Sequence, residues 1–171
     1  MEKNYGERIK QEENFFESFK GEPALLYTGV SCQGLPMVSK LFAINLFDIG
    51  EEFEEEELNA KIELLETTIS GQLATISMNS FIRAKSLVKE IQIILDEEEN
   101  HFGFISFEPM GVNNLYTLEL FTMGQPPSHE EFINKVKNTS ENTFQCLQNP
   151  FCGELKPYAN LKGFLSKLDF S

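Results

Sequence analysis

Apolar residues occur at helical spacing among the charged residues of 2–20. Gly21 follows at a position that commonly ends a helix, and Pro23 cannot continue one. The pattern therefore predicts a first helix that ends near Lys20. Its apolar face is made of Tyr5, Ile9, Phe15, Phe16 and Phe19.

Two apolar stretches, 24–30 and 37–47, are rich in leucine, valine, phenylalanine and isoleucine, and Gly34 and Pro36 separate them. Nearly continuous apolar runs of this length are typical of buried strands, so we expect two strands here. The acidic stretch 48–57 that follows is expected to form a loop or the first turn of a helix.

Residues 61–78 carry conflicting signals. Apolar residues at three- and four-residue steps fit a helix, whereas neighbouring threonine and isoleucine residues favour strands. Ser70 and Gly71 resemble a two-residue turn. The sequence therefore predicts a hairpin in which 61–69 pairs with 72–78.

The next segment, 80–97, shows the clearest helical periodicity of the chain. Asn79 or Ser80 offers a side chain that can cap the first turn. Most charged side chains of the segment fall outside the apolar stripe. We expect this helix to pack on the sheet through Phe81, Ala84, Leu87, Val88, Ile91, Ile94 and Leu95.

Two further strands, His101–Glu108 and Leu115–Met123, are expected to form a hairpin through a turn at 111–114. Ser128 then begins a helix, because Glu131 stands three residues later and completes a capping box. The core stripe of this helix is predicted to consist of Phe132, Val136, Thr143, Phe144 and Leu147.

The C-terminal extension, 148–171, contains a short amphipathic segment at 158–168. We expect this segment to be a last helix that docks on its own domain rather than on another chain. The chain shows no internal repeat. The elements together predict one α+β domain over 1–171, with a mainly antiparallel sheet packed against helices and an extra C-terminal helix.

Acidic residues dominate the charge of the chain. It holds 27 acidic and 14 basic residues, a formal net charge of −13. Residues 48–66 hold nine acidic residues against Lys61, and residues 96–108 hold five with no lysine or arginine. Because lysine and arginine supply the attraction to phosphate, this balance excludes a general nucleic-acid binder. An acidic surface attracts basic protein partners instead.

The cellular compartment is predicted from the start of the chain and from its thiols. The chain is charged from Glu2 onward, and no uninterrupted apolar run is long enough for a signal peptide or a membrane span. The three cysteines, Cys32, Cys146 and Cys152, leave one thiol over in any disulfide scheme. We therefore expect a cytoplasmic protein with reduced thiols and no membrane span.

No residue pattern indicates a catalytic, cofactor or metal site. For Cys32 as a nucleophile, the available bases are His101 and His129, and neither lies in a signature that pairs with cysteine. The spacing of Cys146 and Cys152 matches no zinc pattern. We predict that the protein is not an enzyme and holds no cofactor or metal.

The order of elements on an acidic chain of this size resembles the small acidic chaperones of bacterial type III secretion systems. The resemblance is carried by the helix at 80–97, the hairpin from His101 to Met123 and the capped helix from Ser128. It implies a cytoplasmic, non-enzymatic chaperone or adaptor that holds an extended segment of a secreted protein client. It also implies the capacity to form a homodimer.

Two other functions remain open. The first is an acidic inhibitor, either an immunity protein or a nucleic-acid mimic, whose contact surface would be the acidic clusters at 48–57 and 96–99. The second is a cysteine-dependent enzyme that uses Cys32. Across these hypotheses, the candidate partner surface comprises Glu54, Glu55, Glu56, Glu57, Glu97, Glu98, Glu99, Phe164 and Leu168.

Overall fold

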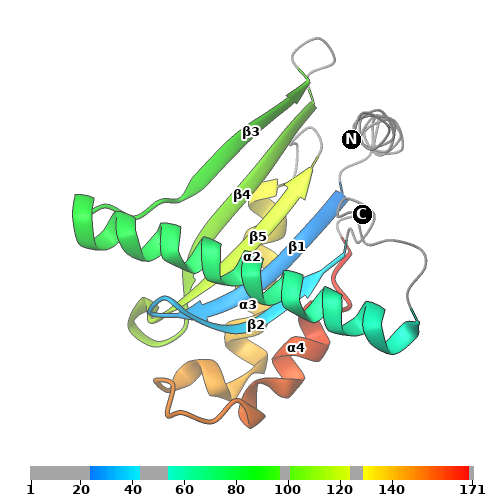
Figure 1. The fold of residues 1–171 in the computed structure, drawn as a ribbon. Coiled ribbons are helices and arrows are strands. Elements are labelled where there is room, and N and C mark those ends of the chain that lie inside the picture. The colour runs from blue at the N-terminus through cyan, green and yellow to red at the C-terminus, as the bar shows by residue number, and fades with distance from the viewer. Residues whose placement is uncertain (1–23, 43–53, 97–100, 124–128, 170–171) are drawn as a thin grey trace.

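A computed structural model describes residues 24–42, 54–96, 101–123 and 129–169. The regular elements, labelled as in Figure 1, are β1 (Ala24–Cys32), β2 (Leu35–Leu41), α2 (Glu55–Ala84), β3 (Glu90–Asp96), β4 (His101–Met110), β5 (Tyr116–Met123), α3 (His129–Thr143) and α4 (Ala159–Leu165). Three short 3-10 turns complete the described structure: η2 (Val112–Asn114), η3 (Gln145–Gln148) and η4 (Lys156–Tyr158).

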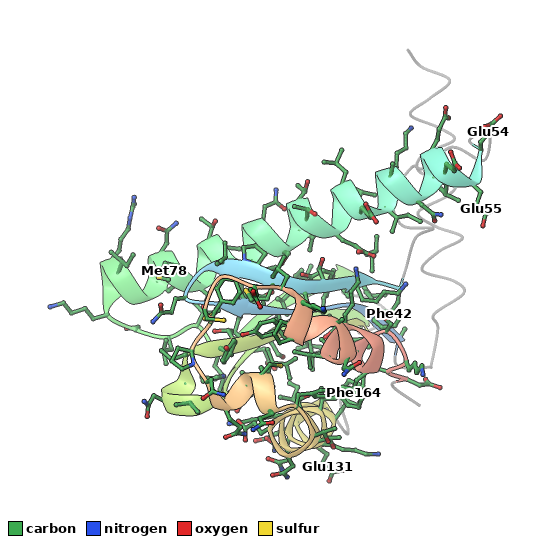
Figure 2. The ribbon with its side chains drawn as sticks, turned by 90° about the horizontal axis from the view of Figure 1, so that it is seen from below. Phe42, Glu54, Glu55, Met78, Glu131 and Phe164 are labelled. Carbon is green, nitrogen blue, oxygen red and sulfur yellow. The ribbon has the colours of Figure 1, made fainter. Side chains whose placement is uncertain are left out.

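The strands form one five-stranded sheet in the order β2-β1-β5-β4-β3. Every neighbouring pair is antiparallel. Helix α2 covers one face of the sheet, and α3 and α4 cover the opposite face (Figures 1 and 2). The predicted α+β class with an antiparallel sheet is therefore confirmed.

The two faces follow from the alternation of side chains along each strand. In β5, Leu118 and Leu120 face α3 and α4, whereas Glu119 and Phe121 face α2. The core on the α3 and α4 side is the larger one. Its buried residues are Leu25, Val30, Cys32, Val38, Met110, Tyr116, Leu118, Leu120, Ile133, Val136, Leu147, Tyr158, Leu161 and Leu165.

The hairpin predicted at 61–78 is wrong, because these residues lie inside the continuous helix α2. The helix places Glu66, Ser70, Leu73 and Ala74 toward the sheet at three- and four-residue steps, and all four are buried. Threonine and isoleucine have only modest helix propensity, and the sheet overrides that preference by burying this face.

The helix predicted at 80–97 is also wrong. Lys85 adopts a left-handed conformation with φ of 49°, which ends α2, and the chain then pairs with β4 as strand β3. Leu87, expected in the core, is 64% exposed. Several apolar positions of this segment suit a strand and a helix alike, and pairing with β4 decides between them.

The remaining predictions agree well with the structure. The strands β1 and β2 and the β4–β5 hairpin are confirmed, and α3 begins at His129, directly after the predicted cap Ser128. Thr143 was expected in the core stripe of α3 but is exposed. Phe144 and Leu147 were expected in the same stripe, but α3 ends at Thr143, so these two residues pack on the core from beyond the helix. The predicted first helix at 2–20, the cap at Ser128 and the end of the strand at 43–47 lie outside the described residues.

The last helix docks on its own domain, as predicted. Leu161 and Leu165 of α4 are buried in the larger core. Just before α4, the Tyr158 hydroxyl lies 2.6 Å from that of Tyr116 in β5, and the Tyr116 hydroxyl lies 2.6 Å from the Asn149 carbonyl oxygen. Residues 146–165 are thus held to the sheet by apolar contacts and by a buried hydroxyl pair.

Candidate functional site

Strand β3 forms one margin of the sheet (Figure 1). The Phe107 amide donates to the Lys89 carbonyl at 2.9 Å. Lys89 and every second residue after it therefore direct their backbone groups toward β4. By alternation, the backbone groups of Gln92 and Ile94 point away from β4. At the other margin, α2 and α4 both pack along β2, and the Leu41 amide donates to Glu66 Oε1 of α2 at 3.2 Å. Among the described elements, β3 packs mainly on β4.

A hollow of about 280 Å³ lies on the α2 side of the sheet, beside the start of β3. Leu87, Val88, Phe107 and Pro109 give it a mainly apolar wall. Helix α2 ends at Ala84, and the segment that connects it to β3 contributes Leu87, Val88 and Lys89 to the lining. The full lining is Ser77, Leu87, Val88, Lys89, Phe107, Glu108, Pro109 and Thr117.

A second hollow, of about 320 Å³, lies on the opposite side of the same strand, between the sheet and α3. Three of its residues are acidic, and Lys89 is the one basic residue of its lining. The full lining is Lys89, Glu90, Ser106, Glu108, Glu130, Ile133 and Asn134.

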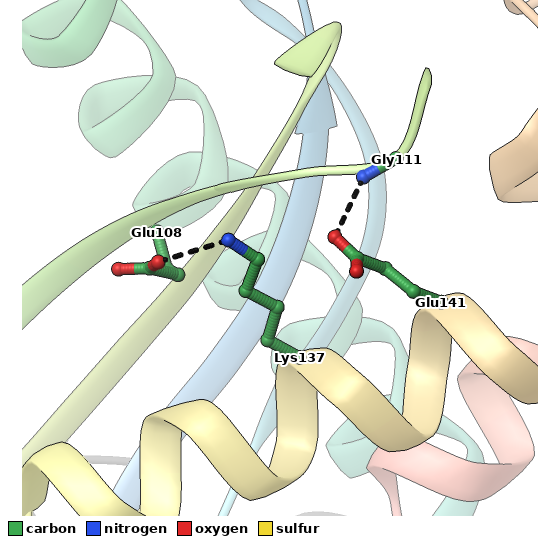
Figure 3. A network of polar contacts seen from close by, with 4 residues as sticks. All are labelled: Glu108, Gly111, Lys137 and Glu141. Carbon is green, nitrogen blue, oxygen red and sulfur yellow. Dashed lines mark hydrogen bonds and ion pairs between the residues drawn. The ribbon is translucent and has the colours of Figure 1, made fainter. Parts of the chain in front are cut away.

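Polar contacts hold α3 beside this second hollow (Figure 3). Lys137 Nζ forms an ion pair with Glu108 Oε1 at 3.2 Å, and the Gly111 amide donates to Glu141 Oε1 at 3.1 Å. Gly111 has φ of 78°, and a Cβ there would lie 2.8 Å from the Leu147 carbonyl oxygen. A glycine is therefore required where the chain leaves β4.

The two hollows and the strand margin together suit an extended peptide. A strand added to β3 would bond to outward backbone groups, as in β-augmentation. Its side chains would point alternately to the two faces of the sheet. One set would meet the apolar hollow, and the other would meet the acidic hollow.

A separate buried polar cluster lies beneath α2. The Glu119 side chain is fully buried, and its Oε1 accepts a hydrogen bond of 2.9 Å from the Ser31 hydroxyl. Among the described residues, Glu119 Oε2 and the hydroxyls of Tyr27 and Ser70 have no hydrogen-bond partner. Burial raises the pKa of Glu119 to about 7, although the Ser31 hydrogen bond opposes the shift. Burial, with the nearby Glu119 carboxyl, also raises the pKa of Tyr27, and the nearby Ser70 hydroxyl opposes this shift.

Of the acidic candidates, Glu54–Glu57 are exposed. Glu54 precedes the first turn of α2 and the other three belong to it, at the end of the helix that projects beyond the sheet (Figure 2). The second acidic candidates, Glu97, Glu98 and Glu99, lie outside the described residues. The structure therefore places one cluster on a helix end, where the helix dipole favours acidic residues.

The two apolar candidates lie at the C-terminal helix. Phe164 and Leu168 are partly buried against the larger core. The ring of Phe164 lies 5.5 Å from that of Phe144, centroid to centroid. Both side chains thus contribute to the contact between α4 and its own domain.

Cys32, Cys146 and Cys152 are free thiols. Burial raises the pKa of Cys32, which reduces its thiolate fraction and its nucleophilicity. The side chains of His101 and His129 are outside the description. In the part of the chain that is described, no three histidine, cysteine or acidic side chains are grouped as metal ligands would be.

Sequence reasoning missed the margin of β3 because it assigned that segment to a helix. It also missed Glu119, although a signal was present: this acid stands between Leu118 and Leu120 in an otherwise largely apolar strand.

Within the described ranges, none of the helices has the length and apolar composition needed to cross a bilayer. Comparisons of the chain with family models, curated proteins and solved structures find no match.

Proposed function

We propose that this chain is a cytoplasmic, non-enzymatic protein-binding protein, a chaperone or adaptor that holds an extended segment of a secreted protein client at β3. One observation carries the proposal: β3 is a margin of the described sheet, and a hollow lies on each face of the sheet beside the start of this strand. Unpaired strand edges are templates for added strands, and proteins commonly cover or charge them. The two hollows beside the start of β3 also offer room for side chains at one end of a bound segment.

The chemistry of the hollows specifies the client. The α2-side hollow, with Leu87 and Phe107, fits an apolar side chain. The α3-side hollow has an acidic lining even though Lys137 pairs with Glu108 and Lys89 is present, because Glu90 and Glu130 also line it, and it therefore fits a basic side chain. The proposed client segment therefore alternates apolar and basic residues, and the net charge of −13 would speed its approach.

Backbone pairing at β3 can be tested with a fluorescent peptide of alternating valine and lysine. Gln92→Pro removes an amide that points away from β4, so it should weaken peptide binding roughly tenfold or more while the β3–β4 ladder stays intact. Gln92→Ala, the matched control, keeps the amide and should stay within about twofold. Anisotropy titration measures both affinities, and thermal melts check that both variants fold.

A peptide methylated at alternate backbone nitrogens provides a second test that leaves the protein unchanged. It keeps the side chains and the charge but cannot donate those hydrogen bonds, so its affinity should fall as it does with Gln92→Pro. Equal binding of the methylated and unmethylated peptides would reject β-augmentation at this margin.

The acidic inhibitor is the second candidate, favoured by the exposure of Glu54–Glu57 at the projecting end of α2. Changing these four residues together to glutamine separates the two functions. A client bound at β3 should keep its affinity within a few-fold. A basic partner of an inhibitor should associate much more slowly, and the difference should shrink at high salt, where charges are screened. Stopped-flow association rates at low and high ionic strength distinguish these outcomes.

A further inference from the structure

Three cysteines from distant parts of the sequence lie around one buried tyrosine pair. Cys32 stands opposite Tyr116 in the β1–β5 ladder, so both side chains point to the same face of the sheet. The Cys146 carbonyl oxygen accepts a hydrogen bond of 3.2 Å from the Tyr116 hydroxyl, and Cys152 follows in the same segment. Burial raises the pKa of Tyr158 and its hydrogen bond with Tyr116 opposes this rise, whereas charge interactions with all three thiols add to it.

The backbone beside Cys152 reaches the Cys32 sulfur. Burial raises the pKa of Cys32, and a hydrogen bond from the Phe151 backbone opposes this rise. The Phe151 ring packs on the Tyr158 ring, with 5.9 Å between the centroids, and lies against the larger core. Phe151 is thus held at both its backbone and its ring. Because consecutive Cα atoms are about 3.8 Å apart, Cys152 begins one such step from a residue that contacts the Cys32 sulfur.

Cys32 and Cys152 differ in exposure. Cys32 is 7% exposed and belongs to the larger core, whereas Cys152 is exposed. A small solute therefore meets the Cys152 thiol first. Gly153 has φ of 103°, and a Cβ at this position would meet nothing within 4 Å among the described residues. The chain after Cys152 thus has room for a backbone adjustment that brings the two cysteine Cα atoms to a disulfide separation of about 4.4–6.8 Å.

The Cys146 sulfur is engaged differently. Burial raises the pKa of Cys146, and hydrogen bonds from its own backbone and from that of Leu147 oppose this rise. The Tyr116 hydroxyl bonds to the carbonyl oxygen of the same residue. Cys146 is therefore held within the turn η3, whereas Phe151 holds the chain before Cys152 at Cys32.

We propose that Cys32 and Cys152 form a peroxide-responsive thiol pair whose disulfide ties the C-terminal segment to β1. The Cys152 thiolate attacks one oxygen of hydrogen peroxide, the O–O bond breaks, and hydroxide departs, which leaves a sulfenic acid on Cys152. The Cys32 sulfur then attacks the Cys152 sulfur, the S–O bond breaks, and water departs with the Cys32 proton. Once the hydroxide takes up the proton that Cys152 lost, two thiols have become one disulfide and the peroxide has become two water molecules. A dithiol reductant reverses the change by thiol–disulfide exchange.

Disulfide mapping of the full chain tests the pairing directly. The native protein is treated with a few equivalents of hydrogen peroxide, and its free thiols are blocked with N-ethylmaleimide as it is unfolded. Chymotrypsin, which cuts after Phe151, then separates Cys146 from Cys152, and mass spectrometry without reduction identifies the linked peptides. We expect Cys32 joined to Cys152 within one chain, with the maleimide on Cys146. Any other pairing, a link formed only between chains, or three blocked thiols after peroxide would overturn the proposal.

The same oxidation in urea is the control for proximity along the sequence. Closing a short loop costs less entropy than closing a long one, so the unfolded chain should favour the disulfide between Cys146 and Cys152. The native fold should replace it with the disulfide between Cys32 and Cys152. The same mixture of disulfides in both conditions would show that the fold does not select the pair, and would overturn the proposal.

Substitutions test whether Phe151 positions the pair. Phe151→Ala removes the ring that holds the chain before Cys152, so the disulfide of the native state should form several-fold more slowly. Leu155→Ala, at an exposed leucine (58%) of the same segment, is the matched control and should keep the native rate. Cys146→Ser should still form the disulfide, and thermal melts check that each variant folds. An unchanged rate in Phe151→Ala, or loss of the disulfide in Cys146→Ser, would overturn the proposal. These outcomes are independent of peptide binding at β3.

Discussion

The two faces of the sheet are both covered by helices, but different interactions hold the covering layers. Beneath α3 and α4, fourteen buried residues form one apolar core, and the buried Tyr116 hydroxyl has partners on Tyr158 and the C-terminal segment. Beneath α2, four buried residues form the apolar cluster, and Glu119, Tyr27 and Ser70 retain buried polar atoms without partners among the described residues.

A helix can therefore cover a sheet face without stabilising it as strongly as the helices on the other face do. A buried polar atom without a hydrogen-bond partner destabilises the folded state, whereas a buried apolar group stabilises it. We infer that the α3 and α4 layer supplies most of the packing energy. By the same reasoning we expect the α2 layer to be held less tightly, and we expect stability to depend on the protonation of Glu119, whose pKa burial raises.

The largest effect is expected from the apolar core. Leu161→Ala should cost roughly 3–5 kcal/mol of unfolding free energy, because the enclosed site cannot collapse around the cavity. Leu73→Ala on α2 should cost less, about 2–3 kcal/mol, since one helix on a small cluster can settle toward the sheet. Urea unfolding measures both. Equal losses, or a larger one for Leu73→Ala, would contradict the comparison of the faces.

The pH dependence of stability is the next effect. Glu119 has a pKa of about 7 when folded, against an ordinary value of 4.5. Between these values the folded chain keeps the proton that the unfolded chain has lost, so stability falls as pH rises from about 4.5 to about 7 and is lowest above that. The full loss from this group is about 3 kcal/mol. Urea unfolding at pH 5 and pH 8 measures it.

Glu119→Gln isolates this contribution, because glutamine mimics the protonated acid and can still accept the Ser31 hydrogen bond. The variant should match the native chain in stability near pH 5 and exceed it near pH 8. If both proteins lose the same stability over this range, Glu119 does not control how α2 is held.

Removing the hydroxyl of one tyrosine on each face should change the free energy of unfolding by a smaller amount, and the two changes should differ between the faces. Tyr116→Phe should cost about 1–3 kcal/mol, because it leaves the buried Tyr158 hydroxyl without its partner. Tyr27→Phe removes a buried hydroxyl with no hydrogen-bond partner among the described residues, so stability should stay the same or rise slightly. Thermal and urea unfolding compare the pair. A large loss in Tyr27→Phe would show that its hydroxyl is satisfied in solution.

The smallest effect on stability is expected at Leu87, which is 64% exposed. Leu87→Ala should change the free energy of unfolding by less than about 0.5 kcal/mol. It should weaken the valine–lysine peptide, since Leu87 lines the α2-side hollow. A loss of several kcal/mol would mean that Leu87 is buried in solution, and unchanged peptide binding would remove it from the proposed site.

The segments that sequence predicted correctly carry local signals that agree with their tertiary environment. In β4 and β5, apolar strands flank a turn with a glycine that needs positive φ. In α3, the Ser128 and Glu131 pattern anticipated a helix that begins at His129. These elements were readable because local preference and burial favour the same conformation.

The candidate site was largely unreadable from sequence. Strand β3 exists because β4 offers a pairing edge, and local periodicity could not reveal that edge. The acidic Glu54–Glu57 cluster was visible in the sequence, but its place at the end of α2 follows from a helix that the sequence did not predict. The buried position of Glu119 depends on α2 crossing above β5.

Local patterns in the sequence were enough to establish the α+β class, most of the strands, the last two helices and the acidic character of the surface. Those properties depend on local spacing, capping residues and charge counts. Tertiary contacts were needed to establish that 61–78 is helical, that 90–96 is a strand, and that a hollow lies on each face of the sheet beside the start of β3. These segments have weak or ambiguous local preferences, so long-range contacts with the sheet supply the energy that selects one conformation.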